Sequence, residues 1–207
     1  GQEMGRDELF IPRHVGYMPQ EVAAINNLTV DEALYFTAHL RGLSRAAARA
    51  ERQRLLELWQ IGELRHKTGP QLSGGERRLT YLAVAMAGSP PVLILDEPTN
   101  DLAPQRRNQV WEILRNLNQA QDTTIIFITH DVIEAEKVIQ WVGIMRDGEL
   151  AAVGRPSDLK KQVDQKLRLE MFTSTETLPR LPDGLTAHQL QPGRWIVWVE
   201  RNAVGDL

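Results

Sequence analysis

Cysteine is absent from the 207 residues, which excludes disulfide bonds and thiolate metal sites. Long apolar runs are absent too. The longest, around residues 92–95 and 125–128, fall far short of the roughly 20 residues that span a bilayer. Residues 1–8 are too polar for the apolar core of a secretory signal. We therefore expect neither a membrane-spanning segment nor a targeting signal in this sequence.

A positive net charge is also missing. The chain has 24 Lys and Arg against 27 Asp and Glu, a formal net charge of −3. Nucleic-acid binding needs clustered Lys and Arg to neutralise phosphates, so no direct nucleic-acid partner is expected. The five arginines between Arg41 and Arg54 are interpreted as a solvated helix face, with a patch for acidic lipid as the alternative.

The first half of the chain is predicted to be mainly helical, over about residues 26–90. Thr29 and Glu32 have the spacing of a capping box, and Ser44 can cap a second helix that stops near Gly62. A third helix is predicted from near Gly75 to the pair Pro90-Pro91. These segments together form the expected α-helical subdomain.

The next part predicts an α/β fold with a parallel sheet. Residues 92–95 form a short apolar run, typical of a central strand covered on both faces. Pro104 fits the first turn of a following helix. Residues 123–128 predict a second strand and residues 131–139 a second crossover helix. Residues 142–153, with the turn pair Asp147-Gly148, predict an antiparallel hairpin.

The texture changes after the hairpin. Residues 166–172 and 194–200 alternate polar and apolar side chains, and several Pro and Gly separate them. We therefore divide the chain into residues 1–163 and a small β-rich appendage at residues 164–207.

Residues 72–76, Leu-Ser-Gly-Gly-Glu, allow two interpretations. Ser73 followed by Glu76 is a plain capping box, and the two glycines could simply form the turn before the helix. However, a helix N-terminus that offers a Ser hydroxyl and unhindered Gly amides is also suited to binding a phosphate. Alone, this stretch favours the structural interpretation.

Three further places hold candidate functional residues. Asp96 and Glu97 directly follow an apolar strand, at the sheet edge where α/β proteins bind ligands. His130 follows the next predicted strand, although an isolated histidine is more often a surface or core residue. Gln20 ends the short stretch Met-Pro-Gln, which by itself is common.

The order of these motifs is more specific than any one of them. Gly-Tyr-Met-Pro-Gln at 16–20, Leu-Ser-Gly-Gly-Glu at 72–76, Val-Leu-Ile-Leu-Asp-Glu at 92–97 and Phe-Ile-Thr-His-Asp at 127–131 follow one another across most of the chain. This series resembles an ABC-type ATPase. The resemblance implies a P-loop NTPase fold, with ATP and Mg²⁺ as cofactors.

The resemblance also implies roles for single residues. Asp96 would hold Mg²⁺ mainly through water, Gln20 would sense the same ion, and Glu97 would be the general base that activates water. His130 would contact the γ-phosphate. Residues 73–75, which are Ser73, Gly74 and Gly75, would complete the ATP site of an opposing cassette, which implies a dimer.

Two features depart from the family. No phosphate loop of the form G-x-x-x-x-G-K-[ST] occurs. The family places this loop a few tens of residues before its Q-loop, which residues 16–20 resemble here. Only 19 residues precede Gln20, so we expect a partial cassette that is inactive alone. Ala103 stands where the family usually has Asp before Pro104, so a helix cap ordinarily worth about 1 kcal/mol is lost. Asp101, two positions earlier, is not assumed to replace it.

The predicted function is the ATP-hydrolysing subunit of an ABC transporter. Its partners would be a transmembrane permease subunit and a second ATP-binding cassette, at the cytoplasmic face of the membrane. Residues 164–207 resemble the C-terminal extension of drug-resistance and ABC-2 type exporter ATPases, which favours export. Two alternatives stay open. One is a soluble ABC-type ATPase that acts on ribosomes or DNA, and the other is a non-catalytic cassette that pairs with a competent partner.

Overall fold

The chain forms two compact units, residues 1–138 and 139–207. The predicted boundary between residues 163 and 164 lies within the second unit, and that division stays a prediction. The computed structural model describes residues 10–21, 27–130, 135–136, 138–163, 166–173 and 186–200.

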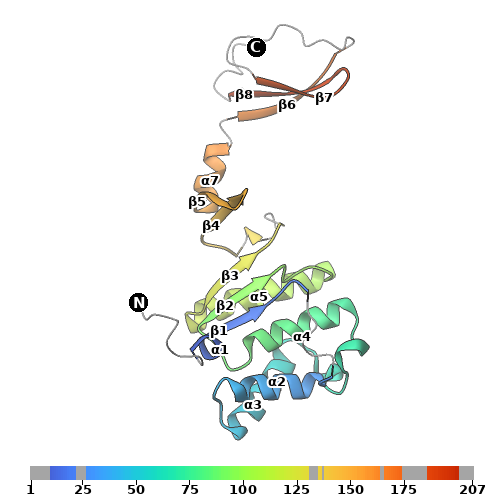
Figure 1. The fold of residues 1–207 in the computed structure, drawn as a ribbon, viewed down its shortest axis with the longest axis vertical. Coiled ribbons are helices and arrows are strands. Elements are labelled where there is room, and N and C mark those ends of the chain that lie inside the picture. The colour runs from blue at the N-terminus through green and yellow to red at the C-terminus, as the bar shows by residue number, and fades with distance from the viewer. Residues whose placement is uncertain are drawn as a thin grey trace. The chain divides into compact units, whose positions relative to one another are not determined.

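A parallel three-stranded sheet forms the centre of the first unit (Figure 1). Its strands are β1 (Val15–Met18), β2 (Val92–Asp96) and β3 (Thr124–Ile128), in the order β1-β2-β3. Both pairings are parallel, as the alternation of strands and helices predicts. Because parallel strands run in one direction, their carboxyl ends lie along one edge of the sheet.

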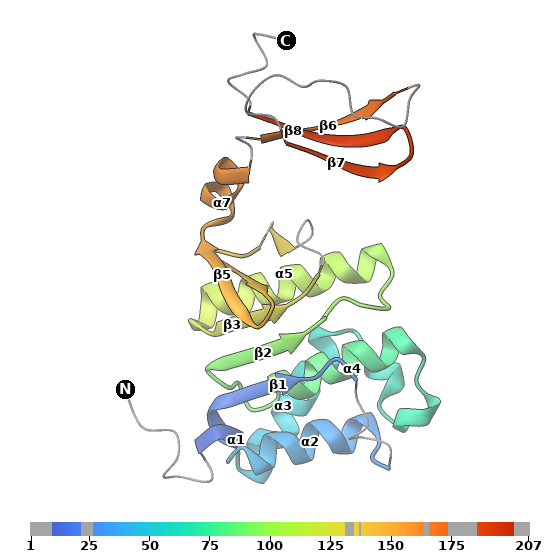
Figure 2. The same ribbon diagram turned by 45° about the horizontal axis from the view of Figure 1, so that its top comes forward.

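Helices pack against this sheet, and their caps are those that the sequence indicates. Thr29 and Ser73 each form a complete capping box, and the Ser44 side chain accepts a hydrogen bond from the backbone N–H of Ala47. The helices α2, α3 and α4 make up the helical region (Figure 2). The helices of the first unit are α1 (Phe10–His14), α2 (Val30–Leu40), α3 (Arg45–Leu58), α4 (Gly74–Met86) and α5 (Pro104–Gln121), with 3-10 turns at Gly62–Leu64 and Gly69–Gln71.

One face of the sheet is buried and the other is largely open among the described residues. Leu95 is fully buried on the face that packs against the helices, and on the same face the rings of Trp111 on α5 and Phe127 lie 5.2 Å apart, edge to face. On the opposite face, Tyr17 on β1 is 55% exposed, and Ile126 on β3, which lies in the same row across β2, is 48% exposed. In the described part of the chain, β2 is therefore buried on one face and less covered on the other, whereas the sequence predicts coverage of both faces.

Gly16 on β1 lets α4 approach the sheet closely. A Cβ atom at this position would lie 2.2 Å from the backbone oxygen of Ala85 and 2.6 Å from a side-chain carbon of Leu93. Because backbone cannot move aside cheaply, we expect Gly16→Ala to cost about 3 kcal/mol in the free energy of unfolding, as overpacking does. Urea unfolding followed by circular dichroism measures this. Gly62→Ala is the matched control, since nothing lies within 4 Å of its Cβ position.

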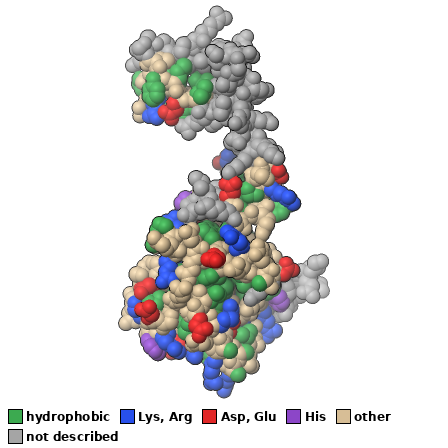
Figure 3. Space-filling view, turned by 180° about the vertical axis from the view of Figure 1, so that it is seen from behind, with side chains coloured by type: hydrophobic (Ala, Val, Ile, Leu, Met, Phe, Trp, Pro, Cys, Tyr) green, Lys and Arg blue, Asp and Glu red, His purple; other side chains and the backbone are tan. Residues whose placement is uncertain are grey.

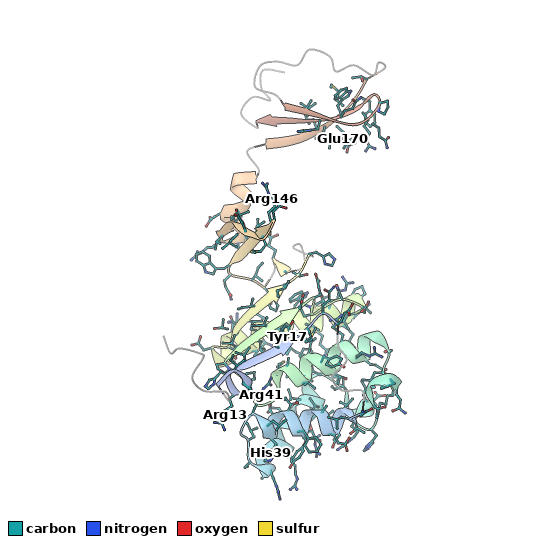
Figure 4. All side chains as sticks on the ribbon, viewed as in Figure 1. Arg13, Tyr17, His39, Arg41, Arg146 and Glu170 are labelled. Carbon is teal, nitrogen blue, oxygen red and sulfur yellow. The ribbon has the colours of Figure 1, made fainter. Side chains whose placement is uncertain are left out.

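Arg41 joins the end of α2 to the end of α4 (Figure 4). Its guanidinium donates hydrogen bonds to the backbone oxygens of residues 84 (3.3 Å) and 85 (2.8 Å), and also to that of Ala87. Its Nε donates to the oxygen of Pro12 at 3.1 Å. Burial lowers the pKa of this group from its ordinary value, yet the carbonyls at a helix C-terminus favour a cation there.

The second unit contains a hairpin, a helix and a second sheet. The turn at Asp147 and Gly148 joins the hairpin strands with positive φ angles of 52° and 82°, as the sequence predicts. The other sheet is antiparallel, in the order β6-β8-β7. The elements are β4 (Val142–Arg146), β5 (Glu149–Gly154), α7 (Pro156–Val163), β6 (Lys166–Phe172), β7 (Thr186–Gln191) and β8 (Arg194–Glu200).

Two expectations concern the whole chain. The predicted crossover helix at residues 131–139 falls largely outside the described residues. Of the helices that the structure describes, none is both long enough and apolar enough to cross a membrane. On the face of the molecule in Figure 3, basic and acidic side chains of the first unit are interspersed, in keeping with the small net charge of −3.

Candidate functional site

The predicted site residues gather at the carboxyl edge of the parallel sheet. Gln20 follows the end of β1 by two residues, Asp96 is the last residue of β2, and Glu97 comes next. His130 follows the end of β3 by two residues. Since the three strands are parallel and in register, these four residues lie along the same edge. This is where open α/β sheets bind ligands.

Glu97 is held in place by the loop that follows β3. Its backbone N–H donates to the oxygen of Ile128 at 2.8 Å, and its φ of 47° is unusual for a residue with a side chain. Its carboxylate accepts hydrogen bonds from the Thr129 hydroxyl (3.1 Å), the His130 backbone N–H (3.1 Å) and His130 Nδ1 (2.7 Å). Glu97 is only 8% exposed, whereas the His130 side chain is 77% exposed.

These contacts determine the charge of Glu97. Burial alone would raise the pKa of this carboxyl, but the hydrogen bonds from His130 and Thr129 outweigh burial, and the pKa lies below its ordinary value. The group is therefore ionised at neutral pH, in the form that can accept a proton. Because the pKa is lowered on folding, the stabilising contribution is present above the unfolded-state pKa and is lost as the pH falls through the folded-state pKa.

Asp96 and Gln20 offer the oxygen donors that a magnesium site needs. Mg²⁺ in nucleotide sites commonly keeps several waters and takes one or two carboxylates besides phosphate oxygens. Asp96 is half-buried at the strand end and Gln20 is exposed on the same edge, so the residues fit such an ion. Among the described residues, no group of three or more His, Cys, Asp or Glu is arranged as a metal site by itself.

The start of α4 is ordered by a reciprocal cap. Ser73 Oγ accepts from the Glu76 N–H at 3.3 Å, and the Glu76 carboxylate accepts from the Ser73 N–H at 2.8 Å. Lys67 Nζ lies 3.0 Å from the same carboxylate. The backbone bond from Ser73 and, after it, the bond from Lys67 lower the pKa of Glu76. The oxygen of the Ser73 hydroxyl thus accepts a hydrogen bond within the helix, while Ser73 and Gly74 remain exposed.

The same helix start contacts the loop that follows Glu97. A Cβ on Gly74 would lie 3.7 Å from the Asp101 Cβ, and one on Gly75 would lie 3.4 Å from the Asp101 oxygen. Ala103 provides no side-chain cap for α5, as the sequence predicts. Arg107 Nε donates to the oxygen of Leu102 at 2.9 Å, which ties the helix to the loop but supplies no acceptor for the first N–H groups of α5.

The structure therefore brings together only part of the predicted set. Glu97 and His130 are in direct contact, and Gln20 and Asp96 lie on the same edge. The hydrogen bonds that the described structure records for Ser73 run within its own helix. The sequence analysis missed Thr129 as a partner of Glu97, although its place one residue before His130 could have pointed to it. The roles of all these residues stay predictions.

Comparison with known proteins agrees with the family that the motifs resemble. Residues 1–100 match the model of the ABC transporter family. The phospholipid-transporting ATPase ABCA3 of Homo sapiens is 35% identical over 162 residues, which are 78% of this chain and 9% of that protein. The sulfate/thiosulfate import ATP-binding protein CysA of Gloeobacter violaceus is 33% identical over 183 residues, covering 88% of this chain and 53% of that protein.

A solved structure shows the same fold. The ATP-binding cassette MJ0796, determined as a dimer in a post-hydrolysis state bound to ADP and Pi, superposes with a TM-score of 0.66. The identity is 22%, over 71% of this chain and 65% of that one, so this likeness concerns the fold alone. A second dimeric structure of MJ0796 superposes with a TM-score of 0.64.

The parallel sheet with helices against one face defines an α/β fold, with a candidate ligand site at the carboxyl edge of the sheet. More narrowly, the chain carries an ATP-binding cassette domain of the ABC transporter family, and it belongs to the ABC-type ATPases. The chain matches 9% of the length of ABCA3 and about half of CysA, so the activity and partners of the whole protein are matters for proposal.

Proposed function

We propose that this chain is part of the ATP-hydrolysing subunit of an ABC transporter, in which nucleotide-driven closure of two cassettes powers a membrane partner. Its place would be the cytoplasmic face of that membrane. Export is the proposed direction, because the β6-β8-β7 sheet fits the extension expected of exporter ATPases. The names of the relatives include both an import protein and a phospholipid-transporting ATPase.

The observation that carries the proposal is the Glu97 carboxylate, which follows β2 and accepts hydrogen bonds from Thr129 and His130. A general base must be charged and correctly oriented. Three hydrogen-bond donors favour the ionised form of the Glu97 carboxylate. The positive φ of Glu97 ends the extended conformation of β2 at this residue. His130 Nδ1 faces Glu97, which leaves the other side of this exposed ring for a phosphate oxygen.

Asp96 and Gln20 would hold the magnesium ion. When bound, Mg²⁺ neutralises charge on the phosphate oxygens. Asp96 supplies one carboxylate at the end of β2, and Gln20 supplies a neutral amide oxygen from the loop after β1. Ser73, Gly74 and Gly75 would contact the nucleotide held by a second cassette, because a helix N-terminus with exposed amides favours an anion.

A binding experiment tests the proposal. The 207 residues contain no phosphate loop, and Mg·ATP needs a cradle of amides and a Lys besides the groups found here. We therefore expect residues 1–207 to bind Mg·ATP negligibly in calorimetry, whereas the whole product of the encoding gene binds and hydrolyses it. Circular dichroism checks that the shorter protein is folded. Micromolar binding by residues 1–207 would contradict the partial-cassette interpretation, and a whole gene product without ATPase activity would favour the non-catalytic alternative.

A further inference from the structure

Arg78 is a buried cation near the start of α4, and its guanidinium group faces two loops. Its side chain is 9% exposed. Its Nη1 donates to the backbone oxygen of Gln20 at 3.3 Å, and its Nη2 lies 3.7 Å from a carboxylate oxygen of Asp101. These partners are 58 and 23 residues away in sequence. One guanidinium therefore contacts the loop after β1 and the loop after β2.

Both of those loops belong to the candidate site. Gln20 itself lies in the first, and the second begins at Glu97 and continues to Ala103. The start of α4 packs on this second loop, since a Cβ on Gly75 would lie 3.4 Å from the oxygen of Asp101. Arg78 is thus at the meeting point of three functional segments of the first unit.

The loop around Asp101 is anchored by the buried side chains of Thr99 and Leu102 and by Arg107, whose Nε donates to the Leu102 oxygen at 2.9 Å, but Asp101 itself is less well held. Asp101 is 70% exposed and has a positive φ of 62°, which is costly for a residue with a side chain. Within the loop, the N–H of Asn100 reaches the Glu97 oxygen at 3.3 Å, and the N–H of Leu102 reaches the Thr99 oxygen at 3.3 Å. Both hydrogen bonds are long. Arg78 on α4 therefore adds a charged partner for this part of the loop, with the small contribution that is usual for such an exposed carboxylate.

A buried guanidinium also makes the two loops depend on each other. Arginine has five N–H donors in a rigid fork. A buried donor that lacks an acceptor destabilises the folded protein. If the Asp101 loop moves away, Arg78 keeps only the Gln20 oxygen and can reorient toward it. If Gln20 moves, Arg78 is free to follow Asp101. Each loop therefore alters the free energy of the other through one side chain.

We propose that Arg78 is a positioning residue that couples the Gln20 loop to the Asp101 loop near the start of α4. The coupling is a property of the fold, and its consequence for ATP turnover rests on the proposed function. Through it, the state of the Mg²⁺-side loop is transmitted to the loop that faces the start of α4. Arg78 does not touch the nucleotide in this proposal.

Amide hydrogen exchange of the whole gene product without nucleotide tests the coupling. Asp101→Asn removes the charge from an exposed side chain, so the protein should fold normally. We expect this change to raise exchange in the segment 97–103 and, by about two- to fivefold, in the segment 18–21, which it does not touch. In Arg78→Gln, exchange rises in both segments, and adding Asp101→Asn should then have no further effect at 18–21.

Arg106→Gln is the matched control, because the recorded hydrogen bond of the Arg106 side chain goes to Gln109 on its own helix, and the backbone bond from its N–H to Ala103 is retained in the variant. It should leave both segments unchanged. If Asp101→Asn leaves exchange at 18–21 as it is, or if its effect persists without Arg78, the coupling is refuted. Arg78→Lys keeps the charge but not the fork, and we expect it to restore only part of the protection.

Steady-state ATPase kinetics separate this inference from the proposed function. We expect Arg78→Gln to lower kcat about tenfold with a smaller change in KM, since the nucleotide contacts are retained. A wild-type gene product that hydrolyses no ATP would overturn the proposed function and leave the exchange result to decide the coupling. Normal kcat in Arg78→Gln together with altered exchange would refute the transmission to turnover.

Discussion

Glu97→Gln in the whole gene product is expected to lower ATP turnover by about 10²–10⁴, the usual contribution of a general base. Glutamine is nearly the same size and can still accept a hydrogen bond from the loop after β3, but it cannot take a proton from water. Mg·ATP binding should be retained, because Asp96 and Gln20 are untouched. The expected product is a dimer that ATP holds closed, seen as a doubled mass in light scattering.

Two controls make this result specific. Glu112→Gln removes the same charge from an exposed position on α5 and should leave turnover unchanged. Thermal unfolding by circular dichroism shows whether the variant is folded, since Glu97 also accepts three hydrogen bonds that fix the loop after β3. Unchanged turnover in a folded Glu97→Gln protein would remove Glu97 from the role of base.

Features that depend on neighbouring residues were predicted correctly from the sequence. The capping boxes at Thr29 and Ser73 need partners only three residues away, so the spacing of residue types is enough. Pro104 in the first turn of α5 and the hairpin turn at residues 147–148 are of the same kind. The parallel sheet followed from the alternation of strands and helices, which allows few topologies.

Features that depend on distant contacts were not predicted. The sequence predicts Arg41 to be one of five arginines on a solvated helix face. In the structure it donates hydrogen bonds to backbone oxygens that lie 43–46 residues further on. Arg78 likewise binds Gln20 across 58 residues. The open face that includes Tyr17 was also unforeseen, because an apolar run in β2 carries no sign of which face is covered.

The same distinction between local features and distant contacts applies to the residues of the candidate site. Asp96, Glu97 and His130 could be found because each directly follows a predicted strand, and parallel strands end at one edge. The backbone of Glu97, with φ of 47°, was beyond the sequence, since it results from the hydrogen bond to Ile128 on β3. Whether residues 73–75 act on the nucleotide of their own chain or on that of a second cassette depends on the dimer, and variants of Gly74 distinguish the two.

Gly74→Leu is expected to abolish nucleotide-driven dimerisation of the whole gene product while leaving its affinity for ATP as an isolated subunit nearly unchanged. Within the chain, a Cβ at Gly74 has its nearest neighbour at 3.7 Å, an ordinary contact, and the residue is exposed. The substitution should therefore not disturb the fold. What a bulky side chain blocks is the close approach of a phosphate to the amides at the start of α4.

Light scattering with Mg·ATP measures dimerisation, and calorimetry at low protein concentration measures the affinity of the monomer. Gly74→Ala is the graded control: its methyl group should weaken the dimer less than leucine does, because the added volume is smaller. The two readouts distinguish the two possible geometries. If the site acts in trans, only the dimer is lost, since the nucleotide of each subunit is held by its own sheet edge. A parallel loss of monomer affinity would show that Ser73, Gly74 and Gly75 contact the nucleotide of their own chain, and the proposed dimer site would then be wrong.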